Sequence, residues 1–134
     1  MDIPHRFESS TRAPGQARHQ VASDLNAFSA ELVSRACLVV SELVTNSVVH
    51  GPAVGSPRID VVVRVLDGVL RIEVANGLQP FRFERGLPPP DSLTGRGLSV
   101  VEGAADRWGI EDGARTCVWA EFDGAAGVGL GGKG

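Results

Sequence analysis

The chain has 134 residues, of which 43% are hydrophobic and 22% charged, and its formal net charge is −3. This length fits one domain, and the mild negative charge argues against the broad basic surface of proteins that bind nucleic acid or anionic membranes. No contiguous apolar run approaches the roughly 20 residues that span a bilayer, and the two cysteines form neither a metal motif nor a disulfide framework, so we expect a cytoplasmic protein.

The first 50 residues predict one short strand and two helices. Residues 1–14 form an N-terminal segment that mixes charged and apolar side chains, which fits a short edge strand. A helix is expected over about residues 13–28, with Pro14 in its first turn, where a missing N–H costs nothing. Ser29 is a suitable N-cap for a second helix over residues 30–50.

From residue 58 onward the hydrophobic period changes from helical to alternating. Residues 58–66 and 69–75 are rich in β-branched side chains and are separated by Asp67-Gly68, a strong hairpin signal. The segment 76–94 carries four prolines and has no periodicity, which indicates a long loop. A third helix is then expected to begin at the glycines of residues 95–97.

A second hairpin closes the predicted domain. Residues 107–111 and 115–122 alternate on either side of a second Asp-Gly turn, and residues 124–134 are so rich in glycine that we expect a flexible tail. The domain should therefore cover residues 15–123. The order of elements predicts an α+β fold, a two-layer sandwich in which helices cover one face of a mixed, mostly antiparallel sheet.

The second helix carries a polar face that suits chemistry. Glu42, Asn46 and His50 are spaced four residues apart and therefore share one side of the helix, opposite an apolar stripe. An amide oxygen such as that of Asn46 is a suitable Mg²⁺ ligand, and a carboxylate one turn away suits a general base. For His50 two roles stay open: contact with a phosphate or with Glu42, or interaction with the last carbonyls of the helix.

Glycines at the start of the third helix predict a second part of the same site. The N-terminus of a helix presents unpaired N–H groups, and Gly95 and Gly97 would let a phosphate approach them, with Arg96 adding a positive charge. Alone, a Gly-Arg-Gly sequence is weak evidence. The long proline-rich segment before it is what a lid over such a site would look like.

Two motifs then resemble those of a known superfamily. SELVTNSVVHG resembles the N-box of the GHKL ATPases, and TGRGL resembles their second glycine box, in the usual order. More narrowly, the span of about residues 17–122 is similar to short stand-alone ATP-binding proteins related to bacterial anti-sigma-factor serine kinases. This resemblance implies a Bergerat ATP-binding fold, ATP and Mg²⁺ as cofactors, Glu42 as general base and Asn46 as metal ligand.

The resemblance also implies an ATP-binding set and protein partners. The set comprises residues on the N-box helix, at the first glycine box and at the second: Asn46, His50, Asn76, Gly77, Thr94, Gly95, Arg96, Gly97 and Leu98. Kinases of this kind phosphorylate a serine on a STAS-type anti-anti-sigma protein and bind a sigma factor reversibly. The resemblance further suggests a homodimer through the sheet or the N-terminal region. From the charge and the motifs we expect no nucleic acid or membrane as partner.

One position departs from the family pattern. The first glycine box normally begins with an aspartate that accepts a hydrogen bond from the adenine amino group, whereas this chain has Asn76. A neutral amide acceptor in place of a carboxylate should cost roughly 1 kcal/mol of binding free energy. The alternative function is therefore a non-catalytic GHKL-fold regulator that binds a protein partner and has weak or no affinity for nucleotide.

Overall fold

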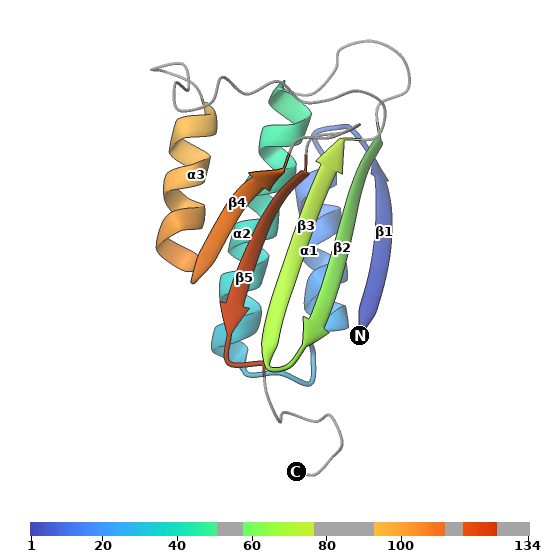
Figure 1. Cartoon of the computed structure of the whole chain (residues 1–134). Coiled ribbons are helices and arrows are strands. Elements are labelled where there is room, and N and C mark those ends of the chain that lie inside the picture. Colours follow the sequence, from blue (N-terminus) through green and yellow to red (C-terminus); the bar gives the residue numbers. More distant parts are fainter. Residues whose placement is uncertain (51–57, 77–92, 112–116, 126–134) are drawn as a thin grey trace.

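The computed structural model describes residues 1–50, 58–76, 93–111 and 117–125, and at residues 50, 76 and 93–98 it describes the backbone alone. Its elements are, in chain order, β1 (Asp2–Glu8), α1 (Ala13–Asp24), α2 (Ala30–His50), β2 (Arg58–Leu66), β3 (Val69–Asn76), α3 (Leu93–Ala104), β4 (Arg107–Glu111) and β5 (Cys117–Asp123). Figure 1 shows α1 and α2 behind the sheet and α3 alongside its β4 edge. This arrangement confirms the predicted two-layer α+β sandwich.

The five strands form one sheet in the order β1-β2-β3-β5-β4, and every pairing in the described part of the chain is antiparallel. The predicted hairpin between β2 and β3 is confirmed, with Leu66 opposite Val69. Its two turn residues, Asp67 (φ 54°) and Gly68 (φ 80°), both have positive φ, as a type I′ turn requires. The predicted edge strand is also present, because β1 pairs with β2 alone.

The core lies between the sheet and the helices. Alternate residues of β2 and β3 are buried beneath α2, whose own inward side is made of small and branched side chains: Ala36, Val39, Val40, Leu43 and Val44. By length and composition alone, the stretch Ala30–Val49 of α2 is apolar enough to cross a membrane. Its contacts with both other helices and with the sheet are those of a central core helix.

Three boundaries differ from the sequence predictions. Helix α1 ends at Asp24 instead of about Phe28, because the chain turns at Leu25, whose carbonyl accepts a hydrogen bond from the Phe28 N–H at 2.9 Å. Helix α3 begins at Leu93, before the glycines, so the predicted loop is shorter at that end. The expected tail begins with packed residues, since Ala125 is fully buried and its N–H donates to the Gly68 carbonyl at 3.0 Å.

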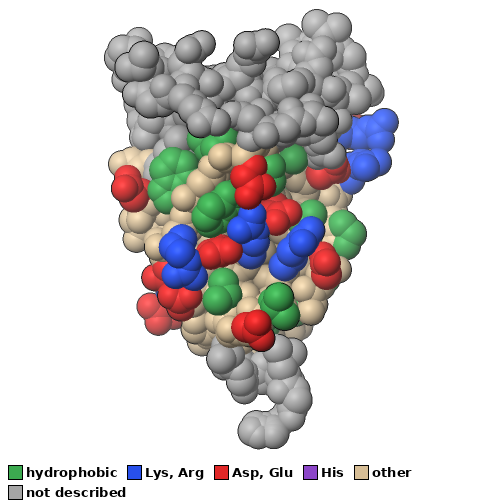
Figure 2. Space-filling view, viewed as in Figure 1, with side chains coloured by type: hydrophobic (Ala, Val, Ile, Leu, Met, Phe, Trp, Pro, Cys, Tyr) green, Lys and Arg blue, Asp and Glu red, His purple; other side chains and the backbone are tan. Residues whose placement is uncertain are grey.

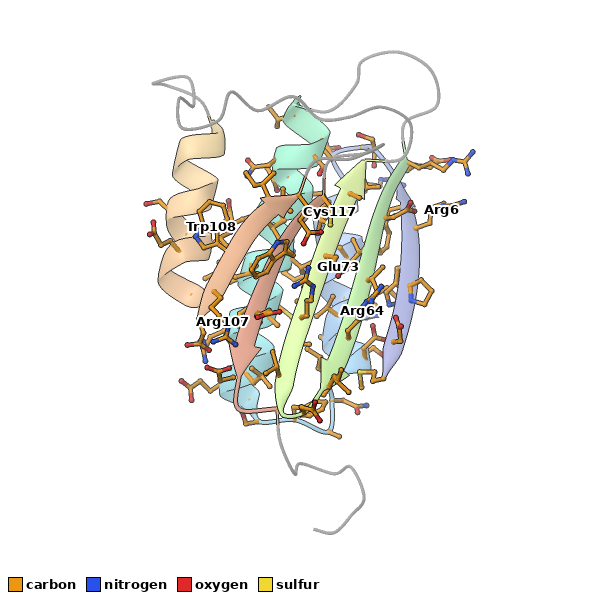
Figure 3. All side chains as sticks on the ribbon, in the orientation of Figure 1. Arg6, Arg64, Glu73, Arg107, Trp108 and Cys117 are labelled. Carbon is orange, nitrogen blue, oxygen red and sulfur yellow. The ribbon has the colours of Figure 1, made fainter. Side chains whose placement is uncertain are left out.

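The face of the sheet opposite the helices carries alternating charges. Figure 2 shows acidic and basic side chains intermingled over this open face. Arg71 of β3 donates to Glu73 at 2.7 Å and to Glu121 at 3.0 Å, and its guanidinium stacks on Trp119 at 4.5 Å from the ring centroid. Figure 3 shows Arg107 on the neighbouring part of the same face, and it donates to Glu121 at 2.9 Å.

Candidate functional site

Three segments that the sequence singled out meet at one end of the domain. These are the C-terminal half of α2, the last residue of β3 and the N-terminus of α3, all at the upper end in Figure 1. Helix α2 packs against α3 and against β3, and its C-terminal end lies at the same end of the domain as the other two segments. The polar face of α2 and the start of α3 can therefore contribute to one site.

Helix α2 places Glu42 and Asn46 in different environments. The helix starts where Ser29 accepts a hydrogen bond from the Leu32 N–H at 3.1 Å, as its predicted N-cap role requires. Glu42 is half-buried, whereas Asn46 is only 5% exposed. The simplest expectation for a polar residue opposite the apolar stripe is contact with solvent, and Asn46 instead lies in the interior.

The buried Asn46 side chain is incompletely satisfied. Its Nδ2 atom has no hydrogen-bond partner within the parts of the chain that the structure describes. A buried amide donor without a partner costs about 1–3 kcal/mol, and native proteins keep few of them. An acceptor from a ligand, such as a phosphate oxygen or a metal-bound water, would supply the missing bond, and rotation of the amide would present its oxygen to a cation.

These residues fit a nucleotide with Mg²⁺. An amide and a nearby carboxylate are oxygen donors of the kind that this ion prefers. The first turn of α3 contains no acidic residue and begins with backbone N–H groups that its own helix leaves unpaired, which suits a phosphate. Among the described residues, no group of three or more His, Cys, Asp or Glu side chains is placed to hold a metal ion, so a protein-only metal cage is not formed there.

For the remaining predicted residues, the structure either describes the backbone alone or does not describe the residue. His50 is the last residue of α2, Asn76 is the last residue of β3, and 94–98 belong to the first turns of α3. Gly77 and most of the proline-rich segment fall at 77–92, outside the described residues. The predicted lid is therefore not placed by the structure.

Sequence reasoning missed a residue that fixes one end of α3. Arg35 of α2 donates through Nε to the Ala104 carbonyl at 2.9 Å, at the last residue of α3, and through Nη2 to Asp106 at 3.3 Å. Its guanidinium also lies 5.6 Å from the centroid of the Phe122 ring. Arg35 thus fixes the C-terminal end of α3 against α2 and the sheet. No local sequence signal pairs it with residues about 70 positions away.

The clearest pKa shifts lie outside the site, on the open face. A hydrogen bond from Arg107 holds the pKa values of Glu121 and Asp123 below their usual range. Burial alone would lower the pKa of Arg71, but the hydrogen bonds that it donates to Glu73 and Glu121 raise it. These shifts come from ion pairs within β3 and between neighbouring strands, so we assign the network to sheet stability.

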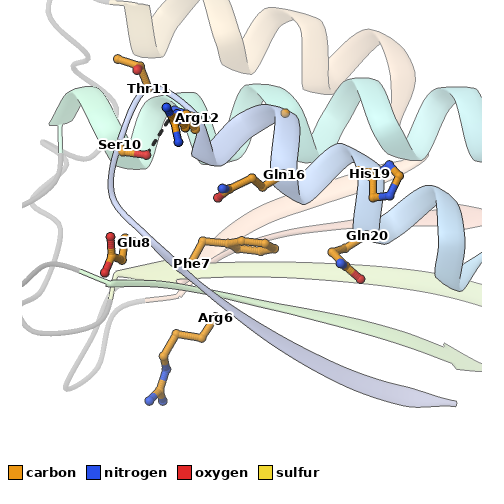
Figure 4. Close-up of a pocket in the computed structure, with 10 residues that line it drawn as sticks. Arg6, Phe7, Glu8, Ser10, Thr11, Arg12, Gln16, His19 and Gln20 are labelled. Atoms are coloured by element: carbon orange, nitrogen blue, oxygen red, sulfur yellow. Dashed lines mark hydrogen bonds between the residues drawn. The ribbon is translucent and has the colours of Figure 1, made fainter.

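A well-defined cavity among the described residues also lies elsewhere. It has a volume of about 890 Å³ and opens between β1 and α1, and none of the residues that line it belongs to α2, β3 or α3 (Figure 4). A second hollow of about 550 Å³ lies on the open face, over Val62 and Ala75. Neither cavity is lined by Glu42 or Asn46.

Comparison with known proteins gives one family. The sequence model described as the histidine kinase-like ATPase domain matches residues 7–122, which is most of the chain. The match spans both segments that meet around Asn46, namely α2 and α3. None of the curated proteins compared with the chain matches it significantly.

Proposed function

Because the chain belongs to the histidine kinase-like ATPase domain family, we propose that it binds ATP with Mg²⁺ where α2, β3 and the N-terminus of α3 meet. The observation that carries the proposal is Asn46, a buried amide whose Nδ2 lacks a partner among the described residues. A ligand that accepts a hydrogen bond from this donor would explain why no described residue does so. The phosphates would lie at the start of α3.

Two residues of α2 have distinct roles in this proposal. Asn46 would hold the metal through its amide oxygen, and Mg²⁺ bound there would neutralise charge on the transferred phosphoryl group. Glu42, one helical turn away and half-buried, would accept the proton of an attacking hydroxyl as general base. Partial burial keeps this carboxylate close to the reaction and leaves it reachable by a substrate.

We further propose the class of reaction and partner. The resemblance of SELVTNSVVHG and TGRGL to anti-sigma-factor serine kinases supports ATP-dependent phosphorylation of a serine on a STAS-type anti-anti-sigma protein. The same resemblance supports reversible binding of a sigma factor by a cytoplasmic homodimer. In this scheme the phosphorylation state of the STAS partner decides how much sigma factor is held.

Two measurements on the intact protein test these steps in order. Mg-ATP should raise the melting temperature, because a ligand that binds only the folded state stabilises it. Incubation with labelled ATP and a purified STAS-domain protein should then give phosphoserine, and Glu42→Gln should abolish transfer while it leaves the thermal shift in place. A thermal shift without phosphoserine would remove the kinase step, and no shift at millimolar Mg-ATP would remove nucleotide binding as well.

A second candidate function rests on one residue. Asn76 stands where the family pattern has the adenine-binding aspartate, which favours weak nucleotide affinity. In this alternative the domain is a non-catalytic regulator that binds its protein partner without ATP. Calorimetry with Mg-ATP separates the two functions, and Asn76→Asp should strengthen binding about fivefold or more if the adenine contact is as proposed.

A further inference from the structure

Strand β1 leaves one edge of the sheet open. It pairs with β2 on one side, and in the described part of the chain no strand lies on its other side. Met1 and Val65 exchange backbone hydrogen bonds, so the odd-numbered residues of β1 direct their N–H and C=O groups toward β2. The even-numbered residues Asp2, Pro4, Arg6 and Glu8 therefore direct theirs outward.

Only part of this edge can bind another strand. Pro4 has no N–H, so the outward edge lacks a donor at its middle, a common protection of edge strands. Arg6 and Glu8 each offer an outward donor and acceptor. The section of β1 that can form backbone pairs is thus Arg6–Phe7–Glu8.

The same three residues line the cavity beside β1. The cavity of about 890 Å³ lies between β1 and α1, and Figure 4 shows Phe7 between the strand and the glutamines Gln16 and Gln20 of α1. A strand added to β1 would run about 4.8 Å from it, beside this space. Every second side chain of that strand would enter the cavity, and the others would lie on the open face.

Charged side chains along the cavity indicate which side chains an added strand should carry. Arg12 stands on the cavity wall beyond the end of β1, and the acidic residue of the lining, Glu8, has its side chain on the alternate face of the strand. An apolar side chain opposite Phe7 and a carboxylate two residues before it, past the end of β1 at Glu8 and on the side of Arg12, would therefore be favoured. In an antiparallel strand the order along the peptide is then acidic, basic, apolar. The middle residue is basic because it lies opposite Glu8.

We propose that this groove binds an extended peptide segment of a partner protein as a sixth strand on β1, with the pattern Asp/Glu, Lys/Arg, apolar. A second copy of the chain fits less well. Centred on Phe7, an antiparallel second β1 would place His5 near Arg12 and provide no carboxylate there. The proposal is independent of nucleotide binding, because the groove shares no residue with the α2–α3 site.

The test uses the full chain and a defined probe, the fluorescein-labelled heptapeptide Ser-Thr-Asp-Lys-Leu-Thr-Ser, followed by fluorescence anisotropy. Binding should saturate, and Glu8→Pro should weaken it about tenfold or more by removing the outward N–H without touching the β1–β2 ladder. Two controls should keep most of the affinity: Glu8→Ala, which retains the N–H, and Asp2→Pro, which removes an outward N–H outside the groove. Unchanged melting temperatures would show that the variants are folded.

A charge exchange tests the register. The peptide with Lys in place of Asp should bind the natural protein several-fold more weakly, and Arg12→Glu should restore its binding. On peptide addition, the amides of Arg6 and Glu8 should exchange hydrogen more slowly. Absence of saturable binding, or equal affinity for the natural protein and Glu8→Pro, would overturn the proposal. So would self-association in sedimentation that Glu8→Pro abolishes, because a second copy would then occupy the edge.

Discussion

Substitution of Asn46 by leucine should make the protein more stable and remove its response to nucleotide. Leucine has the same branched side-chain skeleton as asparagine, so Asn46→Leu exchanges a buried amide for methyl groups with little change of shape. In the ligand-free protein the amide donor is buried and unpartnered among the described residues. Its removal eliminates a desolvation cost that no bond to the described residues offsets.

The size of both effects follows from the burial. Relief of one unsatisfied buried donor is worth about 1–3 kcal/mol, which corresponds to a rise of about 3–10 °C in melting temperature for a chain of this length. Mg-ATP at about 100 times its Kd should stabilise the natural protein by about 2.7 kcal/mol. The variant should show the first effect and lack the second, because leucine can neither ligate a cation nor donate to a phosphate.

Differential scanning fluorimetry with and without Mg-ATP measures both quantities in one experiment. Ser47→Ala is a matched control, since Ser47 is the neighbouring buried polar residue on α2, at 7% exposure, and has no assigned role in the site. It should keep the shift caused by Mg-ATP. A lower melting temperature for ligand-free Asn46→Leu would refute the assignment of Asn46 as an amide that awaits a ligand, and so would a full Mg-ATP response in this variant.

Three further predictions concern catalysis, packing and pH. Glu42→Gln should reduce phosphoserine formation by about 10²-fold or more, the usual contribution of a general base, with an unchanged Kd for Mg-ATP in calorimetry. Gly109→Ala should cost about 1–3 kcal/mol in urea unfolding, because its Cβ would lie 2.6 Å from Cζ2 of Trp119, whereas Gly103→Ala, with nothing within 4 Å, should be neutral or stabilising. The pKa of Glu121 is lowered from 4.5 by its arginine partners, so its contribution to stability is present above that pH and is lost as the pH falls through the lower folded-state value. Glu121→Gln should flatten the fall of melting temperature below pH 4.5, and an acid-unfolding curve parallel to that of the natural protein would contradict this assignment.

The secondary-structure elements that depend on neighbouring residues alone could be predicted from the sequence. The turn at Asp67-Gly68 needs two residues that tolerate positive φ, so the β2–β3 hairpin follows from that dipeptide and the alternation on either side. The bounds of α2 follow equally well from Ser29 and the helical period. The predicted end of α1 was several residues too late. Leu25 and Phe28 belong to a turn after the helix, but their buried side chains continue the apolar spacing of the helix.

For the candidate site, the sequence predicted which helices lie together but not how far each side chain is buried. The spacing of Glu42 and Asn46 on α2 and the glycines of α3 identified which segments belong together. Asn46 is buried and Glu42 only half-buried because of packing between segments that are distant in the sequence. The hydrophobic periodicity of one helix does not predict such packing. The contact of Arg35 with the end of α3 is of the same kind, since nothing near residue 35 indicates its partner.

The contacts of Arg35 fix α3 at its C-terminal end, which is the end far from the proposed phosphate site. A helix of 12 residues is about 18 Å long, so a tilt of about 5° at the Ala104 end would move the first turn by about 1.5 Å. Displacements of that size are large compared with the tolerance of phosphoryl transfer. A partner that competes for Arg35 or Asp106 would therefore shift the proposed phosphate-binding end of α3 without touching it. Binding near the C-terminal end of the helix would in this way affect the proposed site at its N-terminal end.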